Sequence, residues 1–170
     1  GRNNKQRQYT LLFCRRKQSS MEVKNLFDQQ AYEEIIIRLQ NLTATSERQW
    51  GKMTAAQMLA HCKEAYKVPL TSKKLKRLPI SYIGWIFRPV LYNSRPYGKS
   101  LPTAPNFIIK DDRDFEKEKA EMLSIVKAFH ERGASGIGDK MHPTFGPMKA
   151  EQWGKSMWKH LDHHLRQFGV

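Results

Sequence analysis

Apolar residues recur at helical spacing in four stretches of this 170-residue chain. The first stretch runs from about Asp28 to Gln40, and Asp28 is a residue type that caps helix N-termini. The second begins at Thr54, which forms a capping-box pattern with Gln57 three residues later, and Pro69 limits its far end. Both stretches predict amphipathic helices with one face turned toward a core.

The other two stretches lie in the second half of the chain. The third predicted helix runs from about Asp112 to Arg132, begins with acidic residues, and is followed by Gly133, a residue suited to a left-handed C-terminal stop. The fourth runs from about Ala150 to Phe168, and a loop with prolines and glycine at 143–147 precedes it. The pattern therefore predicts four helices and no strand.

A segment of roughly 40 residues, Leu70 to Lys110, joins the second and third helices and is rich in proline and aromatic residues. Such a long crossover lets two consecutive helices run parallel, whereas short loops make antiparallel neighbours. The expected fold class is therefore all-α: a four-helix bundle, up-down-down-up, with a long crossover between helices 2 and 3. We expect a short helix near Tyr82 to Leu91 within this crossover.

The net charge of +14 at pH 7 is concentrated in two places. Residues 1–20 hold six basic residues and no acidic one, and their composition differs from the segment that opens at Met21. We therefore expect residues 1–20 to be a tag or upstream extension that is not native, and residues 21–170 to form the domain. A second cluster, Lys73, Lys74, Lys76 and Arg77, lies in the crossover. Charge confined to a tail and a loop disfavours a nucleic-acid groove surface.

Two further features bear on location. No run of 18 apolar residues exists, so the sequence predicts no membrane-spanning helix and no membrane partner. The two cysteines, Cys14 and Cys62, disfavour a disulfide framework and favour a reducing compartment, so we expect a cytoplasmic protein.

Three histidines form a candidate metal site. His160 and His164 lie one turn apart within the apolar arc of the fourth helix, which is the spacing at which two imidazoles bind one ion. His61 lies at the margin of the apolar face of the second helix. If those two helices are antiparallel neighbours, all three rings lie at one level, roughly 10 Å from a shared end. A metal would account for three inward imidazoles; the alternative is core histidines that are hydrogen-bonded to carbonyl groups.

The residues around these histidines resemble a known superfamily. Ala60-His61-Cys62, the C-terminal stretch Lys159–Phe168, and His142-Pro143-Thr144-Phe145-Gly146 followed by Trp153 resemble the DinB-like superfamily over about residues 21–170. More narrowly, the chain resembles a bacterial branch known as a domain of unknown function. The resemblance implies a four-helix bundle with a nickel or zinc ion on His61, His160 and His164.

Two functions remain open at this level. The first is a metal-dependent enzyme, of thiol-transferase or hydrolase type, acting on a small molecule, with a low-molecular-weight thiol as a candidate substrate. It follows from the open coordination position that three histidines leave on a divalent ion, and from the activities of DinB-like relatives. The second is a non-catalytic basic module that binds an acidic protein or nucleic acid around a structural metal. Relatives often dimerise, so a homodimer is also open.

Several other residues carry weaker expectations. We expect Asp162 to face solvent as an ion-pair partner, Cys62 to be buried and unreactive, and His142 to be structural. His163 could support a metal ligand from beside the site, act as a cation at the helix end or be exposed, and the last two are favoured. Four aromatic residues are candidate pocket walls, although a plain core position is favoured for each: Tyr66, Trp85, Tyr92 and Trp153.

Overall fold

The computed structural model describes residues 20–73, 75–99 and 107–170. The expected non-native extension, residues 1–20, falls almost wholly outside these ranges. The described part is mostly helical and includes one small two-stranded sheet, which places it in an all-α-like class. None of its helices has the length and apolar character needed to cross a membrane.

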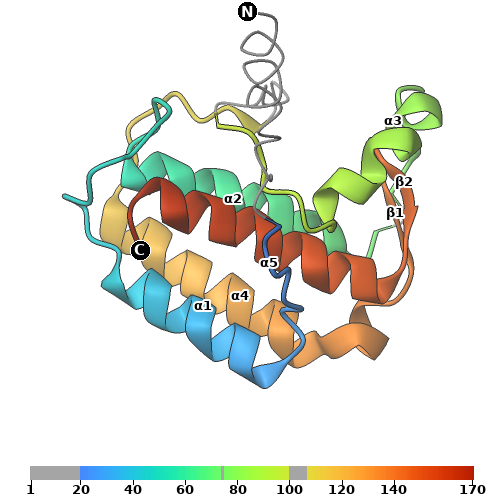
Figure 1. Cartoon of the computed structure of the whole chain (residues 1–170), viewed down its shortest axis with the longest axis horizontal. Helices are drawn as coiled ribbons and strands as arrows, with labels where there is room; N and C mark the ends of the chain where they lie inside the picture. The colour runs from blue at the N-terminus through green and yellow to red at the C-terminus, as the bar shows by residue number, and fades with distance from the viewer. Residues whose placement is uncertain (1–19, 74, 100–106) are drawn as a thin grey trace, which may run out of the picture.

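Four long helices form the body of the molecule, close to the four predicted stretches. The colour gradient in Figure 1 shows that the first and last of them run one way and the other two run the opposite way. The Thr54–Gln57 capping box is present as predicted, and Asp114 caps the third long helix by accepting from the amide of Lys117. The long helices are α1 (Gln29–Asn41), α2 (Ala55–Leu70), α4 (Phe115–Ile137) and α5 (Ala150–Gln167).

The helix α5 is the most enclosed of the four, because it contacts α1, α2, α4 and the crossover. Its apolar residues Trp153, Leu161 and Leu165 are fully buried in the common core. Enclosure on several sides also buries polar residues of α5, including Asp162, which is 2% exposed. The expectation that Asp162 faces solvent is therefore wrong: the helical wheel placed it opposite the apolar arc, but α1 covers that side.

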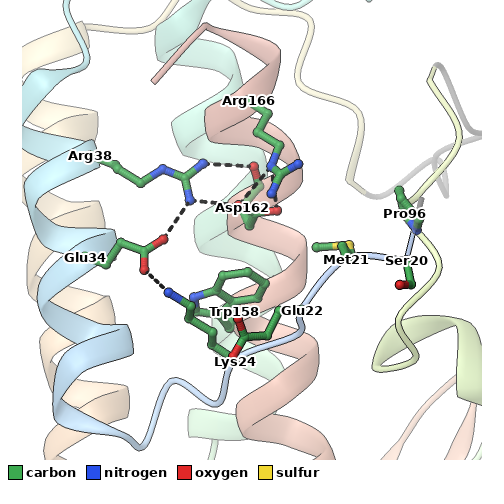
Figure 2. Close-up of a pocket in the computed structure, with 10 residues that line it drawn as sticks. All are labelled: Ser20, Met21, Glu22, Lys24, Glu34, Arg38, Pro96, Trp158, Asp162 and Arg166. Carbon is green, nitrogen blue, oxygen red and sulfur yellow. Dashed lines mark hydrogen bonds and ion pairs between the residues drawn. The ribbon is translucent and has the colours of Figure 1, made fainter.

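Figure 2 shows how the buried carboxylate of Asp162 is satisfied. Arg38 of α1 donates to Asp162 Oδ1 at 2.8 Å, and Nε of Arg166 donates to the same oxygen at 3.1 Å and lies 3.0 Å from Oδ2. Glu34 pairs with both Arg38 and Lys24 in the same network. A charge removed from water needs such partners, so this network ties α1 to α5.

The crossover contains the helix that the sequence predicts near Tyr82 to Leu91. It consists of α3 (Ser81–Phe87) followed by the 3-10 helix η1 (Arg88–Leu91). The buried ammonium group of Lys159 on α5 donates to the carbonyls of Val90 and Asn93, which holds η1 against α5.

Two details of the predicted elements need correction. Residues 143–147 are not a simple loop, because β1 (Lys140–His142) and β2 (Gly146–Met148) pair antiparallel around a short turn. The ring of His142 supports this turn by accepting from the amides of Thr144 and Phe145. In addition, α4 breaks at Gly133, as predicted, but one more turn follows as far as Ile137.

Candidate metal centre

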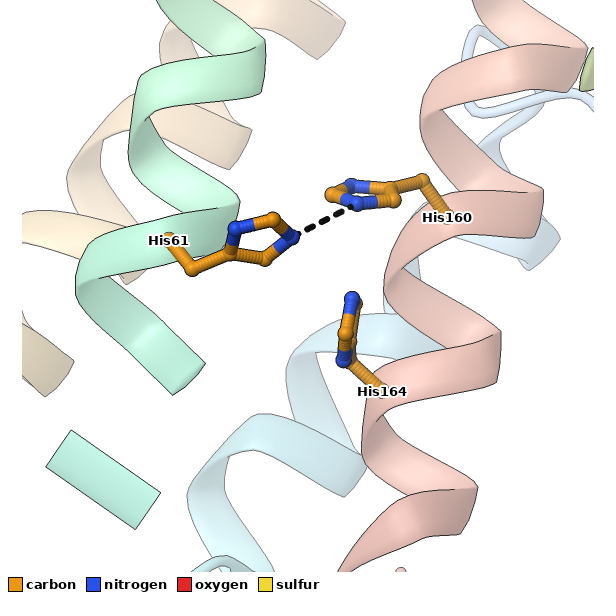
Figure 3. Close-up of side chains that lie close together, drawn as sticks. All are labelled: His61, His160 and His164. Carbon is orange, nitrogen blue, oxygen red and sulfur yellow. Dashed lines mark hydrogen bonds between the residues drawn. The ribbon is translucent and has the colours of Figure 1, made fainter. Parts of the chain in front are cut away.

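The three predicted histidines converge between α2 and α5. His61 comes from the second turn of α2, and His160 and His164 come from consecutive turns of α5 (Figure 3). His61 and His164 are buried, at 7% and 8% exposure, and His160 is partly buried. The capping box at Thr54 sets where α2 begins, and therefore at which level His61 meets α5. The predicted convergence is confirmed.

The spacing of the rings fits a single ion. The Nε2 atoms of His61 and His160 face each other at 3.2 Å (Figure 3), and one nitrogen from each of the three rings lies within 4.8 Å of the others. Zinc–nitrogen bonds of roughly 2.0–2.1 Å at a tetrahedral angle place two ligand nitrogens about 3.3 Å apart. The His61–His160 pair already has this separation, and a nitrogen of His164 lies within 4.8 Å of both.

Hydrogen bonds at the outer nitrogens orient two of the rings. The Nδ1 atom of His61 lies 2.9 Å from the carbonyl oxygen of Phe107, and Nδ1 of His164 lies 2.9 Å from Oε1 of Gln167. Both partners are acceptors, so each Nδ1 carries the proton and each Nε2 presents its lone pair. Metal-binding histidines are oriented in this way by carbonyl or carboxylate partners.

Two neutral rings whose lone pairs face each other would repel, so an additional positive centre between them is favourable. His160 can relieve this by turning an Nε2–H toward His61, but its buried Nδ1 has no hydrogen-bond partner within the described ranges. Among the described residues that nitrogen lacks a partner whether Nε2 faces an ion or His61, so only the facing lone pairs of His61 and His160 favour an ion. The donor set of the three rings therefore suits a divalent ion.

Burial keeps the three rings uncharged. It lowers the pKa of His164 to about 3 and the pKa of His61 below its usual value. Burial and the neighbouring imidazoles hold the pKa of His160 well below 6.5. All three are therefore neutral at pH 7, which is the form that binds metal ions.

A family comparison agrees with part of the resemblance. The model of a family described as a protein of unknown function, DUF1569, matches residues 21–169. The chain belongs to the DUF1569 family. No match was found among curated proteins, and none among solved structures.

A fourth histidine, His163, lies beside the three-histidine cluster. It is neither exposed nor a cation. Its ring is partly buried and lies 5.2 Å from His164, 5.6 Å from Trp50 and 5.5 Å from Tyr97, centroid to centroid. Burial lowers the pKa of His163, so the ring is neutral at pH 7. The expectation of a charged or exposed residue is wrong, because Trp50 and the crossover residue Tyr97 cover this side of α5.

The remaining predicted residues lie away from the three histidines. Cys62 is fully buried, and burial raises the pKa of its thiol, so it is unreactive as predicted. His142 stacks on Trp153 with ring centroids 5.5 Å apart, a structural role as predicted. The candidate pocket walls divide into fully buried core residues, Tyr66 and Trp153, a half-buried Tyr92, and an exposed Trp85.

Sequence reasoning missed the two oxygen atoms that accept hydrogen bonds from His61 and His164, the Phe107 carbonyl oxygen and Gln167 Oε1. Gln167 follows His164 by three residues on one helix, so the spacing at which side chains of a helix meet could have revealed it. The Phe107 carbonyl belongs to the backbone of the long crossover, and no side-chain pattern reports on it.

Proposed function

We propose that this chain is a metal-dependent enzyme of the DinB-like superfamily that acts on a small molecule, by thiol transfer or hydrolysis. His61, His160 and His164 are its ligands for a nickel or zinc ion. One observation carries the proposal: two Nε2 atoms face each other at 3.2 Å while oxygen acceptors hold the outer nitrogens of His61 and His164.

The arrangement of the helices supports the superfamily assignment. With α1 and α5 running one way and α2 and α4 the other, the long helices match the up-down-down-up order (Figure 1). We therefore assign the fold as a DinB-like four-helix bundle. The ligand positions on α2 and α5 are those that the resemblance implies.

The chemistry follows from the ligand set. When bound, a divalent ion on three histidines retains an open coordination position, where it can lower the pKa of a water to about 7 or hold a substrate thiol as a thiolate. Because no carboxylate belongs to the described cluster, the ligands leave the ion's charge uncompensated. This favours an anionic group at the open position. Phe107 and Gln167 keep the rings oriented while substrate exchanges.

The alternative is a basic binding module for nucleic acid or an acidic partner, with a structural metal. The basic crossover is its main support. Structural zinc sites use four protein ligands almost without exception, whereas three-ligand sites keep a position open for chemistry. The described cluster has three members, so we place the enzyme first.

Elemental analysis of protein purified without a polyhistidine tag tests the metal assignment. We expect close to one equivalent of nickel, zinc or a similar ion, and the substitution His164→Ala should remove it. His130→Ala is a matched control, because His130 lies outside the cluster and hydrogen-bonds to Leu26 and Gln29. Retention of metal by the His164→Ala protein would show that the ligand assignment is wrong.

A second experiment tests the reaction. We expect the metal-loaded protein to accelerate transfer of a low-molecular-weight thiol to an electrophile, or hydrolysis of an activated ester, and the metal-free protein to lose this activity. A protein that holds metal, lacks both activities and binds DNA with strong salt dependence would favour the binding module instead.

A further inference from the structure

The short helix α3 presents its large apolar side chains to the outside. Tyr82, Ile83, Ile86 and Phe87 are all exposed, and so is Trp85. The side that packs against the molecule consists of small residues, and the two that are buried are Ser81 and Gly84. A helix on the surface of a globular protein normally has the reverse arrangement, with its apolar stripe facing the core.

This exposure is concentrated in one place. Ten large apolar residues are exposed among the described residues, and only Ile37 and Ile108 lie elsewhere. Isolated apolar side chains are normal on a protein surface, but a contiguous group of this kind marks an interaction site. The other eight are Leu78, Ile80, Tyr82, Ile83, Trp85, Ile86, Phe87 and Val90, and we call them the apolar knob.

The hairpin β1–β2 holds the apolar knob in this position. A Cβ atom on Gly84 would lie 2.1 Å from the carbonyl oxygen of Thr144, so the backbone of α3 rests directly on the turn. The amide of Leu78 donates to the carbonyl of Pro143 at 3.1 Å, and Arg88 donates to the carbonyl of Pro147. Figure 1 shows α3 beside the hairpin, projecting from the end of the long helices where α5 begins. The hairpin therefore supports one side of α3, and the opposite side, which carries the apolar knob, is exposed.

The crossover segment that carries the apolar knob has charge of one sign. From Ala65 to Lys110 the sequence contains nine basic residues and no acidic residue. Lys73, Lys76 and Arg77 are exposed just before α3, and Arg88 follows it. Arg77 also lies over the ring of Tyr82, with its guanidinium carbon 4.0 Å from the ring centroid. An apolar surface surrounded by cations complements a partner that is both apolar and anionic.

We propose that the apolar knob docks this protein onto the surface of an anionic phospholipid membrane without crossing it. Apolar side chains enter the boundary between headgroups and acyl chains, and neighbouring lysine and arginine side chains meet anionic headgroups. Tyr82 and Trp85 belong to the residue types that favour this boundary. The sequence-based expectation of no membrane partner rested on spanning length alone, which peripheral docking does not require.

A second copy of the chain fits the apolar knob less well than an anionic membrane does. A symmetric dimer through the apolar knob would bring the basic crossover of one copy against that of the other, with no acidic residue of the crossover to pair with it. An anionic lipid surface neutralises the same charges. Charge complementarity therefore selects the membrane.

Co-sedimentation of the full chain with vesicles tests the proposal. We expect binding to vesicles of phosphatidylcholine and phosphatidylglycerol in a two-to-one ratio, and weaker binding to phosphatidylcholine alone. Ile86→Glu should weaken binding to the mixed vesicles at least about ten-fold, because it places a charge in the apolar face and removes apolar area that the membrane would bury. Lys73→Glu together with Lys76→Glu should weaken it roughly five-fold for each lysine.

The matched control is Ile37→Glu on α1. Ile37 is 56% exposed and Ile86 is 58% exposed, so both substitutions replace an equally exposed isoleucine of a helix. Ile37→Glu should leave vesicle binding unchanged, and circular dichroism should show the same helix content in both variants. Equal binding by the wild type and Ile86→Glu would overturn the proposal. Light scattering that shows a dimer in the wild type and a monomer in Ile86→Glu would also overturn it, in favour of a second copy.

Discussion

Gln167 connects His164 to the loop before α2. Its Oε1 accepts from Nδ1 of His164 at 2.9 Å, and its amide nitrogen donates to the carbonyl of Trp50 at 2.8 Å. The amide of Gln49 in turn donates to the carbonyl of Gln167 at 2.7 Å. The orientation of one proposed metal ligand is therefore coupled to the end of the loop that leads into α2, the helix that carries His61.

This coupling predicts that Gln167 controls metal affinity. Gln167→Met keeps the length of the side chain but removes the acceptor for His164, and we expect metal affinity to fall by about 10- to 100-fold. Competition with a fluorescent chelator measures the change. Gln40→Met, at an exposed position on α1, serves as the control. An unchanged affinity in Gln167→Met would show that this hydrogen bond does not orient the ligand.

The two arginines around Asp162 should differ in their contribution to stability. Arg38 is partly buried against the buried Asp162, with side-chain exposures of 17% and 3%, whereas Arg166 is 57% exposed. Arg38→Ala should lower the free energy of unfolding by about 3 kcal/mol, because it leaves a buried carboxylate with only one partner. Arg166→Ala should lower it by less than about 1 kcal/mol. Urea denaturation of both variants measures this, and equal losses would contradict the structure.

His142 should make the stability of the protein depend on pH. Burial lowers the pKa of this ring to about 4 from an ordinary value of 6.5. The unfolded chain therefore binds the proton more readily than the folded chain. The stability that depends on neutral His142 is complete above about pH 6.5 and is lost as pH falls toward about 4, by at most about 3 kcal/mol.

The substitution His142→Asn isolates this effect. Asparagine can accept from the amides of Thr144 and Phe145 in place of Nδ1, but it does not titrate. Urea denaturation at about pH 7.5 and about pH 4.5 should show a larger loss of stability in the wild type than in His142→Asn. Parallel losses in the two proteins would show that another group is responsible.

The contact between α3 and the hairpin should be sensitive to one methyl group. Gly84→Ala would place a Cβ 2.1 Å from the carbonyl oxygen of Thr144, and backbone cannot yield as a side chain can. We expect a loss of about 1–3 kcal/mol and faster hydrogen exchange in β1 and β2. Gly136→Ala is the control, because its Cβ would meet only the flexible side chain of Arg132 and alanine favours a helix. Equal effects of the two substitutions would contradict the close packing at Gly84.

The long helices were predictable because their signals are local. Thr54 and Gln57 form a capping box between neighbouring residues, and Gly133 interrupts α4 through its own backbone conformation. His160 and His164 share one face of one helix, so their pairing follows from helical geometry alone. The height of His61 along the bundle, matching that of His160 and His164, also followed from its distance from the start of α2, once α2 and α5 were taken as antiparallel neighbours.

The failures of sequence reasoning share one cause. A helical wheel identifies the apolar side of α5, but it does not show that α1 and the crossover also cover its polar sides. Asp162 and His163 were therefore expected at the surface, although Arg38, Trp50 and Tyr97 enclose them. The hairpin was missed for a related reason: its strands have three residues each, too short to show alternation.

The sequence by itself determined approximately where the four long helices lie and which face of α2 and α5 carries histidine, because these properties depend on residues within one or two turns of each other. Only the tertiary structure decided which oxygens orient the imidazoles and that the apolar residues of α3 lie outside. Those outcomes depend on segments far apart in the chain, such as Phe107 with His61 and Thr144 with Gly84, whose meeting no local pattern encodes.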